Sequence, residues 1–215
     1  MDKSLSINAV ISKVKDGMTL MIGGFLANGT PETIIDALVE SGVKNLTIIA
    51  NDTSFPDRGL GKLVANKQVK KMITSHIGTN PATAAQLNAK ELEIEFVPQG
   101  TLAERVRAGG SGLGGVLTQT GLGTIVAEGK QVINVAGKDY LLETPLRADI
   151  AFIGASVSDA QGNLVYKGTS KNFNPLMAMA ADTVIVEAKE MVEVGSIAVE
   201  QVHTPAIFVD HILAK

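Results

Sequence analysis

Short apolar runs rich in β-branched residues alternate with helical segments along most of the chain, and this alternation constrains the fold more than any other feature. The runs expected to be strands are LTIIAN at Leu46–Asn51, KMITSH around Ile73, LEIEFVPQ around Ile94, ADIAFIGAS around Ile150 and DTVIVEA around Val184. Such alternation is typical of βαβ units, in which helices connect parallel strands. The sequence therefore predicts an α/β fold with a mostly parallel sheet.

Local signals divide the chain further. Thr30-Pro31, Asn80-Pro81 and Asn174-Pro175 each place a capping side chain before a proline, which favours a helix start. Residues Gln131 to Glu143 alternate around a central Ala-Gly-Lys and predict a hairpin, so the sheet is expected to be mixed. Because no linker-like stretch and no internal repeat interrupts the pattern, we expect one domain over residues 1–215.

The composition excludes several classes of partner. A net charge of −3 and a pI near 5.6 leave no broad basic field, so neither nucleic acid nor an anionic membrane is an expected partner. The absence of cysteine removes thiolate nucleophiles and thiolate metal sites. The start of the chain carries charges within its apolar run, unlike a signal peptide, and the apolar runs are shorter than the ~20 residues of a membrane span. We expect a cytoplasmic protein.

The stretch TLMIGGFLANGTPETII joins an expected strand to an expected helix through three glycines, Gly23, Gly24 and Gly29. Glycines let a backbone approach a ligand closely, and the start of a helix carries partial positive charge. This arrangement suits an anionic or carbonyl-bearing ligand. A tight strand-to-helix turn without a ligand explains the glycines equally well.

Two phosphate-binding motifs are tested against the glycine-rich stretches. Gly24 and Gly29 have the spacing of a P-loop, but Thr30 and Pro31 follow where that motif needs Lys and then Ser or Thr. The run from Gly110 to Gly115 matches the dinucleotide pattern formally, yet it follows a helical segment and precedes no clear helix. Neither motif indicates a nucleotide cofactor, and NAD is not expected.

A longer pattern carries a family resemblance. Asp16-Gly17, two residues, the apolar residues 20–22, Gly23-Gly24-Phe25, three residues and Gly29-Thr30-Pro31 match the signature of the first subunit of family I CoA-transferases. The stretches that look similar to their α subunits, in the same order, are IANDTSFPDRGLG, SHIGTNP, VPQGTLAERVRAGGSGLGG, TQTGLGT, YKGTSKNFNP and AADTVIVEA. The resemblance covers nearly the whole chain. It implies the three-layer CoA-transferase fold, an open sheet with helices on both faces, distantly related to that of sugar-phosphate isomerases.

The resemblance also implies a mechanism. In that family a glutamate attacks an acyl-CoA thioester and then carries CoA as a glutamyl thioester to a second carboxylic acid, without a metal or another cofactor. The glutamate belongs to the partner β subunit, and the corresponding place here reads Ala50-Asn51-Asp52-Thr53. Asn51 has no carboxylate and is expected only to donate a hydrogen bond that helps to polarise the substrate. Asp52 and Glu193 are the substitutes to weigh, but a capping role and a solvated face are the commoner outcomes.

The chain is therefore expected to be half of an enzyme, with CoA as a substrate and a β subunit as partner, in an α2β2 assembly. By the same resemblance, Gln99 polarises the thioester carbonyl, although a side-chain amide in this position can also simply bond backbone. The residues expected to bind CoA are Gly23, Gly24, Phe25, Leu26, Ala27, Asn28 and Gly29. The substrates implied are acetoacetyl-, acetyl- or butyryl-CoA and short-chain carboxylic acids.

Other candidates receive structural interpretations. Arg105 and Arg107 precede the glycine cluster and suit a carboxylate, but a solvated helix face is commoner. His76, His203 and His211 are scattered and are expected to be structural. Two alternative classes remain: a non-catalytic acyl-CoA-binding module of the same fold, and a sugar-phosphate isomerase, which the missing loop lysine disfavours.

Overall fold

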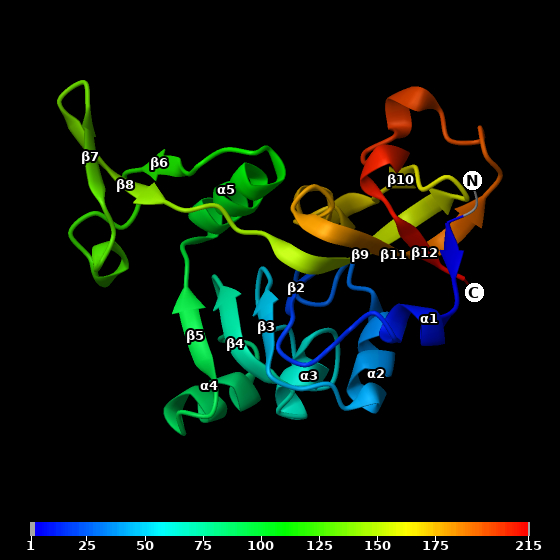
Figure 1. The fold of residues 1–215 in the computed structure, drawn as a ribbon, viewed down its shortest axis with the longest axis horizontal. Coiled ribbons are helices and arrows are strands. Elements are labelled where there is room, and N and C mark those ends of the chain that lie inside the picture. Colours follow the sequence, from blue (N-terminus) through cyan, green and yellow to red (C-terminus); the bar gives the residue numbers. More distant parts are fainter. Residues whose placement is uncertain (1–2, 215) are drawn as a thin grey trace.

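A computed structural model describes residues 3–214, and its fold is shown in Figure 1. The strands of the main sheet are β1 (Ser4–Leu5), β2 (Thr19–Ile22), β3 (Leu46–Ile49), β4 (Val69–Thr74), β5 (Glu93–Phe96), β9 (Ala148–Asp159), β10 (Leu164–Val165), β11 (Ala181–Val192) and β12 (His211–Leu213). Within the described residues, the sheet order is β1-β12-β11-β9-β2-β3-β4-β5, with β10 beside β9. All neighbours are parallel except β10 and β9, which confirms the mostly parallel α/β fold.

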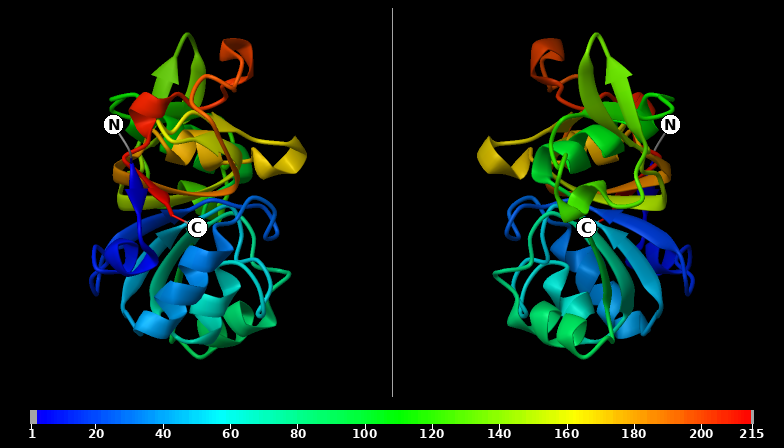
Figure 2. Two further views of the ribbon diagram at one scale, coloured as in Figure 1. Left: turned by 90° about the vertical axis from the view of Figure 1, so that its right-hand side faces the viewer. Right: turned by 90° about the vertical axis from the view of Figure 1, so that its left-hand side faces the viewer.

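Helices cover both faces of this sheet. They are α1 (Ile7–Ile11), α2 (Glu32–Ser41), α3 (Gly61–Ala65), α4 (Pro81–Asn88), α5 (Gln99–Gly110) and α6 (Asn174–Met177), with 3-10 turns η1 (Ile125–Ala127), η2 (Gly168–Ser170), η3 (Val199–Gln201) and η4 (Ala206–Phe208). Figure 2 shows α2, α3 and α4 on one side of the sheet and α5 on the other. The layered arrangement implied by the resemblance is therefore confirmed.

Two apolar cores form because strand side chains alternate between the faces. On β2, Leu20 and Ile22 pack with α1, α2 and α3, whereas Met21 packs in the opposite layer with α5 and α6. All three side chains are fully buried. A strand buried on both faces reads as a continuous apolar run, which is why the sequence marks β2, β3 and β4 clearly.

The predicted hairpin exists, but it does not make the main sheet mixed. β7 (Val132–Val135) and β8 (Lys138–Glu143) are antiparallel and join across Ala136 and Gly137, both at positive φ, as a two-residue hairpin turn requires. β8 pairs on its other side with β6 (Val116–Thr118), so the three strands form a separate sheet. This arm stands away from the main sheet in Figure 1. The antiparallel pair within the main sheet is instead β10 with β9.

A helix begins at or within one residue of each of the three predicted prolines, but one of the three predicted side-chain caps is confirmed. Asn80 caps α4 by accepting hydrogen bonds from the backbone N–H groups of Ala82 and Thr83, and Pro81 is the first helical residue. The predicted caps at Thr30 and Asn174 are wrong. Helix α2 begins after Pro31 without a side-chain cap from Thr30, and Asn174 is the first residue of α6, after an N-cap position held by Phe173.

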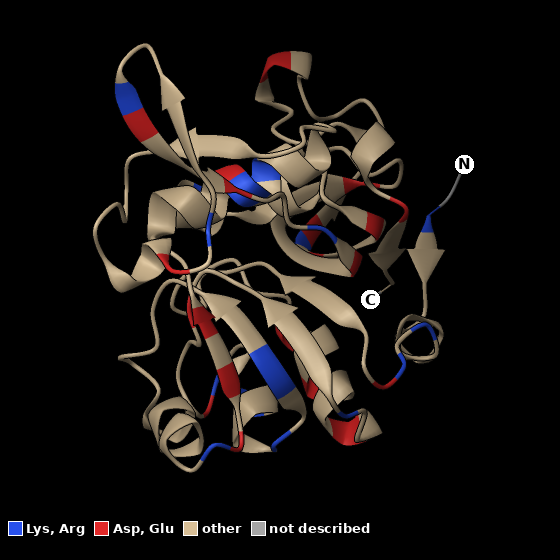
Figure 3. Ribbon diagram, turned by 60° about the vertical axis from the view of Figure 1, so that its left-hand side comes forward, with Lys and Arg blue, Asp and Glu red and all other residues tan. Residues whose placement is uncertain are grey.

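Strand β5 forms one edge of the main sheet, and charged side chains cover it. Lys71 on β4 pairs with Glu93 at 2.9 Å and with Glu95 at 3.6 Å across the strand boundary. Blue and red segments accordingly lie next to one another on these strands in Figure 3. The charges protect the edge from pairing with a further strand.

The order of the strands locates the binding crevice. The chain runs outward from β2 through β3 and β4 to β5, and later returns on the other side of β2 through β9, β11 and β12. The direction of winding therefore reverses between β2 and β9. Open α/β sheets bind ligands at the carboxyl ends of the strands beside such a reversal.

Candidate active site

A pocket of about 460 Å³ lies at the carboxyl ends of β2, β3, β4 and β5. Its walls come from the four loops that follow these parallel strands, so residues far apart in sequence meet at one edge of the sheet. The lining residues are Phe25, Leu26, Asn51, Asp52, Ser75, His76, Thr79 and Gln99. We call this cavity the strand-end pocket. It contains both residues expected to polarise the substrate and the tip of the loop expected to bind CoA.

A larger groove of about 670 Å³ lies between α5 and β6. Its Gly100 and Thr101 follow Gln99 at the start of α5, but the two cavities have no lining residue in common among residues 3–214. Of the residues singled out in the sequence, the groove contains Arg107, which is paired with Glu104. The chemistry-bearing side chains therefore favour the smaller cavity as the candidate site.

Asn51 and Gln99 lie in direct contact. Gln99 Nε2 donates a hydrogen bond to Asn51 Oδ1 over 2.5 Å, and Ser75 Oγ donates to Gln99 Oε1. Ser75 is fixed in turn, because its single hydroxyl hydrogen is shared between Gln99 Oε1 and the Asn51 carbonyl, which lies 2.7 Å from Oγ. A carboxamide carries two N–H groups. The second N–H of Gln99 and the NH2 group of Asn51 form no hydrogen bond within residues 3–214, which leaves them as donors for a ligand.

Asp52 holds two loops of the site in place by accepting hydrogen bonds from their backbone N–H groups. It is buried, with Oδ2 accepting from the backbone N–H of Leu26 at 3.0 Å and Oδ1 accepting from that of Ser54 at 2.7 Å. The bond from Ser54 is the local backbone bond expected from the sequence, whereas the bond from Leu26 joins a loop 26 positions away. Because both oxygens are occupied by the protein's own N–H groups, the geometry offers little support for Asp52 as a nucleophile.

The loop tip that Asp52 holds has an unusual backbone. Leu26 and Ala27 have φ values of +47° and +67°, a region in which residues with a Cβ cost about 1–2 kcal/mol each. The turn is closed by paired backbone hydrogen bonds between Phe25 and Asn28, at 3.0 and 2.8 Å. Such strain persists only where surrounding contacts enforce it, and it concentrates at functional sites.

The three glycines of the loop are required by the protein's own packing. A Cβ on Gly23 would lie 1.7 Å from Asn174 Oδ1, and one on Gly29 would lie 2.5 Å from the Ser170 carbonyl. Gly24 has φ +135°, and a Cβ there would meet the Thr30 hydroxyl at 2.1 Å. Asn174 explains the close approach, because its side chain accepts from the Gly154 N–H and donates to the carbonyls of Gly29 and Ser170.

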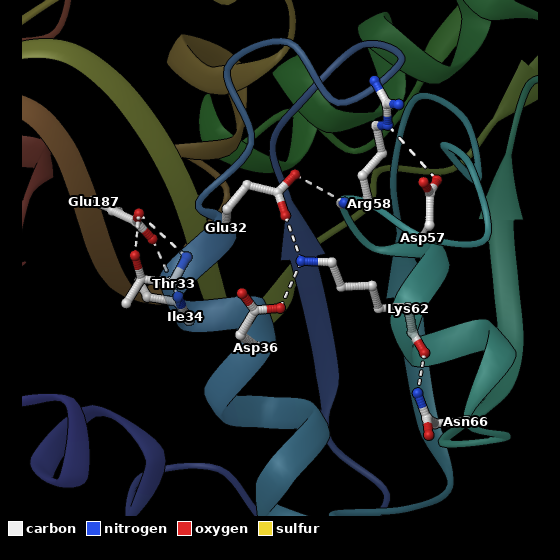
Figure 4. A network of polar contacts seen from close by, with 10 residues as sticks. Glu32, Thr33, Ile34, Asp36, Asp57, Arg58, Lys62, Asn66 and Glu187 are labelled. Atoms are coloured by element: carbon white, nitrogen blue, oxygen red, sulfur yellow. Dashed lines mark hydrogen bonds and ion pairs between the residues drawn. The ribbon is translucent and has the colours of Figure 1, made fainter.

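The helix start behind the loop is not free for an anion, contrary to the expectation from the sequence. Glu187 on β11 accepts hydrogen bonds from the backbone N–H groups of Thr33 and Ile34 and from the Thr33 hydroxyl, as Figure 4 shows. A carboxylate from a distant strand thus neutralises the N-terminus of α2. Sequence cannot reveal this contact, because 154 positions separate Thr33 from Glu187.

Glu32 ties the loops after β2 and β3 together. Its Oε1 accepts from the Gly59 N–H at 2.8 Å, and its Oε2 accepts from Lys62 Nζ at 2.9 Å (Figure 4). Lys62 also binds Asp36. Partial burial alone would lower the pKa of Lys62, but the hydrogen bonds to Asp36 and Glu32 outweigh it and raise the pKa. The network holds the loop walls of the strand-end pocket against α2.

Arg105 is buried, contrary to the expectation of a solvated face. Its guanidinium binds Glu95 at 2.7 Å and the Thr144 carbonyl at 2.8 Å, and it lies 3.9 Å from the buried Glu143. Burial alone would raise the pKa of Glu95, but the hydrogen bond and charge of Arg105 outweigh burial and lower that pKa. Arg105 thereby connects β5, α5 and the three-stranded arm.

The remaining candidates have structural roles or lie elsewhere. Gly109 and Gly110 end α5, where a Cβ would meet the Leu146 carbonyl and Met179, and the glycines after them form a connection to β6. Glu193 is exposed in the turn after β11, outside the strand-end pocket. Within residues 3–214, no cluster of three or more histidine, aspartate or glutamate residues suits a metal, and no helix is long and apolar enough to cross a membrane.

Three pocket residues were missed at the level of sequence: Ser75, His76 and Thr79. They belong to the stretch SHIGTNP, which contributes to the family resemblance but contains no catalytic motif of its own. The available signal was positional. β4 lies between β3 and β5, so the loop after it had to lie between Asn51 and Gln99.

Comparison with known proteins agrees with this geometry. A model of the coenzyme A transferase family matches residues 4–215, and the chain therefore belongs to that family. Within it the chain is an α subunit. It is 58% identical over 201 residues to the acetoacetyl-CoA:acetate/butyrate CoA transferase alpha subunit of Clostridium acetobutylicum, covering 94% of this chain and 92% of that protein. It is 50% identical over 213 residues to the acetate CoA-transferase subunit alpha of Escherichia coli K12, covering 99% and 97%.

Solved structures share the fold. An acyl-CoA transferase of Escherichia coli O157:H7, in a thioester complex with CoA, superposes with a TM-score of 0.88 at 22% identity; the match covers this whole chain but 47% of that one. Glutaconate coenzyme A-transferase from Acidaminococcus fermentans gives a TM-score of 0.84 at 18% identity, over 98% of this chain and 75% of that one. The CoA-transferase fold implied by the resemblance is confirmed.

Proposed function

We propose that this α subunit, together with a β subunit, transfers CoA between acetoacetyl-CoA, acetyl-CoA or butyryl-CoA and a short-chain carboxylic acid. One observation carries the proposal: the strand-end pocket presents unused amide donors of Asn51 and Gln99, and no glutamate among residues 3–214 lines it. A pocket with donors and no carboxylate free to attack is what one half of a CoA-transferase needs. The names of the similar α subunits suggest the substrates.

The proposed reaction proceeds through two carboxylic anhydrides. A glutamate of the β subunit attacks the thioester carbonyl, and collapse of the tetrahedral adduct expels CoA thiolate and leaves an acyl-glutamyl anhydride. The thiolate attacks the glutamyl carbonyl, which releases the first carboxylate and forms a glutamyl-CoA thioester. The second acid repeats these steps in reverse and leaves as its CoA thioester. Each step exchanges a carboxylate and a thiolate, so no oxidant or reductant is needed.

Within this scheme, Gln99 and Asn51 stabilise the developing oxyanion. Negative charge grows on the thioester oxygen during attack, and fixed donors aimed at such an oxygen are commonly the largest catalytic contribution. The hydrogen bond between the two amides and the one from Ser75 hold them in place before substrate arrives. Preorganisation of this kind avoids a reorganisation cost at the moment of reaction.

The loop of residues 23–29 is proposed to contact acyl-CoA through its tip. Phe25 and Leu26 line the strand-end pocket, whereas the glycines face the protein interior. CoA then serves as a substrate, without a tightly bound cofactor. Gly24→Val is a poor test of this role, because the positive φ and the contact with Thr30 would strain the loop.

We propose that the β subunit joins this chain in an α2β2 assembly that works in the cytoplasm, where acyl-CoA thioesters are made. Large apolar side chains on and beside the arm support a protein partner there. Leu117 is 43% exposed, Val132 50% and Ile125 82%. Leu117 pairs with Leu142 and Val132 with Leu141 on β8, so the two side chains project from opposite faces of the arm. Exposed apolar side chains on an element that stands away from the sheet favour contact with a protein partner.

Reconstitution tests the proposal. The chain is mixed with its β subunit and assayed for CoA transfer from acetoacetyl-CoA to acetate and to butyrate, with each subunit alone as control. We expect turnover only in the mixture. Turnover by this chain alone would contradict the half-site assignment, and CoA binding without turnover in the mixture would favour a non-catalytic acyl-CoA-binding module.

A further inference from the structure

The imidazole ring of His76 packs against Gly78, at a position where no other residue would leave room for it. His76 follows β4 and lines the strand-end pocket, where its backbone pairs with that of Asp52. Gly78 leaves the space for the imidazole: a Cβ there would lie 2.8 Å from Cε1 and 3.1 Å from Nε2 of His76. The φ of Gly78 lies outside the region that demands glycine, so packing against the ring accounts for the absent side chain.

The imidazole nitrogens of His76 are available to a ligand. Within residues 3–214 its ring forms no hydrogen bond or ion pair. The other two histidines differ. His203 accepts from the Tyr166 backbone N–H at 3.0 Å and stacks on the Tyr166 ring, while burial and the nearby charge of Lys13 lower the pKa of His211 on β12. The structural interpretation made for all three histidines therefore suits His203 and His211 better than His76.

Few donors in the pocket remain for a ligand. The Thr79 hydroxyl donates to the Ser54 carbonyl at 2.8 Å, and the Ser75 hydroxyl is engaged with Asn51 and Gln99. Because Asn51 and Gln99 are bonded to each other, their free N–H groups suit one shared oxygen. His76 belongs to a different loop and is bonded to neither, so it suits a second oxygen.

Acetoacetyl-CoA carries such a second oxygen. Its acyl group has four carbons, like butyryl, but bears a carbonyl at C3 where butyryl has a methylene. A ketone oxygen only accepts hydrogen bonds, and an imidazole always has at least one N–H to donate. The apolar walls formed by Phe25 and Leu26 suit the carbon chain of either substrate.

We infer that His76 is a specificity-determining residue that donates a hydrogen bond to the 3-oxo oxygen of acetoacetyl substrates and so favours them over saturated acyl groups of equal length. The inference rests on the proposed function. A site that hydrogen-bonds a substrate oxygen discriminates against the analogue lacking it, because the donor is then left unpaired.

The test compares two substrates in each enzyme variant and uses the ratio of their kcat/KM values. We would measure kcat/KM for acetoacetyl-CoA and for butyryl-CoA, with acetate as the common acceptor, in the reconstituted α/β enzyme. His76→Phe keeps a planar ring but removes the N–H donor. Gly78→Ala leaves His76 in the sequence but displaces its imidazole from the observed position. Partial unfolding lowers both rates equally and cancels in the ratio. His211→Gln and Gly114→Ala are the matched controls, since no atom lies within 4 Å of an added Cβ at Gly114.

We expect the acetoacetyl-to-butyryl ratio to fall about tenfold to a hundredfold in His76→Phe and less in Gly78→Ala, as loss of one hydrogen bond implies. His76→Gln, which retains an N–H donor, should recover part of it, and the controls should keep the wild-type ratio. Equal losses of kcat/KM for both substrates in His76→Phe would overturn the inference about His76 but not the proposed function. A wild-type mixture inactive on both substrates would overturn the proposed function and the inference with it.

Discussion

At the scale of single residues, the site consists of a few polar side chains held by the loops after four strands. Asn51 and Gln99 were predicted from the family resemblance, and the structure brings them within hydrogen-bond distance. Their roles remain proposals, and each has a specific consequence. Ser75 and Asp52 hold the neighbouring groups in position without reaching a reacting atom in the proposed mechanism.

Gln99→Ala should lower kcat of the reconstituted enzyme while leaving its assembly intact. Removal of one oxyanion donor costs about 3 kcal/mol of transition-state stabilisation, or roughly a hundredfold in rate. Steady-state kinetics on acetoacetyl-CoA and size-exclusion chromatography measure the two effects. Gln161→Ala, which removes an exposed amide outside the pocket, is the control. An unchanged kcat in Gln99→Ala would contradict the assigned role.

Ala27→Gly should stabilise the chain slightly. Ala27 has φ +67°, and relief of about 1–2 kcal/mol of left-handed strain exceeds the roughly 0.4–1 kcal/mol of entropy that glycine adds to the unfolded state. The same substitution at Ala85, exposed in α4, should destabilise by about 1 kcal/mol. Urea unfolding of both variants gives the sign, and a loss of stability in Ala27→Gly would refute the strain assignment.

At the scale of elements, apolar runs and their order predict the main sheet well, because strands buried on both faces leave continuous runs in the sequence. The hydrogen-bond partners of the N–H groups at helix starts were harder to predict from the sequence. Asn80 caps its own helix through local bonds, as predicted, whereas the N–H groups at the start of α2 bind Glu187 from β11. Long-range partners of this kind depend on tertiary structure and leave no local pattern.

The arm shows the same limit. Its hairpin was predicted from alternation and a two-residue turn, but the pairing of β8 with β6 and the contact of Arg105 with the Thr144 carbonyl were not. Arg105 looked like part of a solvated face beside Glu104. The structure gives that environment to Arg107 and buries Arg105 between Glu95 and the arm.

Arg105→Gln should destabilise the chain by about 3 kcal/mol, because it leaves the buried Glu143 and the half-buried Glu95 with one partner fewer each. Arg107→Gln, two positions away, removes an exposed pair and should cost less than about 0.5 kcal/mol. Chemical denaturation followed by circular dichroism measures both variants. Equal, small losses would show that the buried pair does not hold the arm.

At the scale of the whole molecule, the main sheet separates two apolar cores, and the candidate site lies at the carboxyl ends of its strands. We propose that residues 1–215 form a single domain, since β2 contributes side chains to both apolar layers. The site lies beside the reversal in strand order, and its walls are the loops after β2, β3, β4 and β5. A pocket with donors and apolar walls but no free carboxylate is chemically incomplete by itself, which makes the β subunit part of the proposed active site.

The location of the covalent CoA adduct tests this account most directly. The reconstituted enzyme is incubated with acetoacetyl-CoA in the absence of an acceptor acid, and peptide mass spectrometry then identifies the chain and residue that carry CoA. We predict a glutamyl-CoA thioester on the β subunit and none on this chain. An adduct on Asp52 or Glu193 of this chain would contradict the claim that it is the half of the enzyme without the nucleophile.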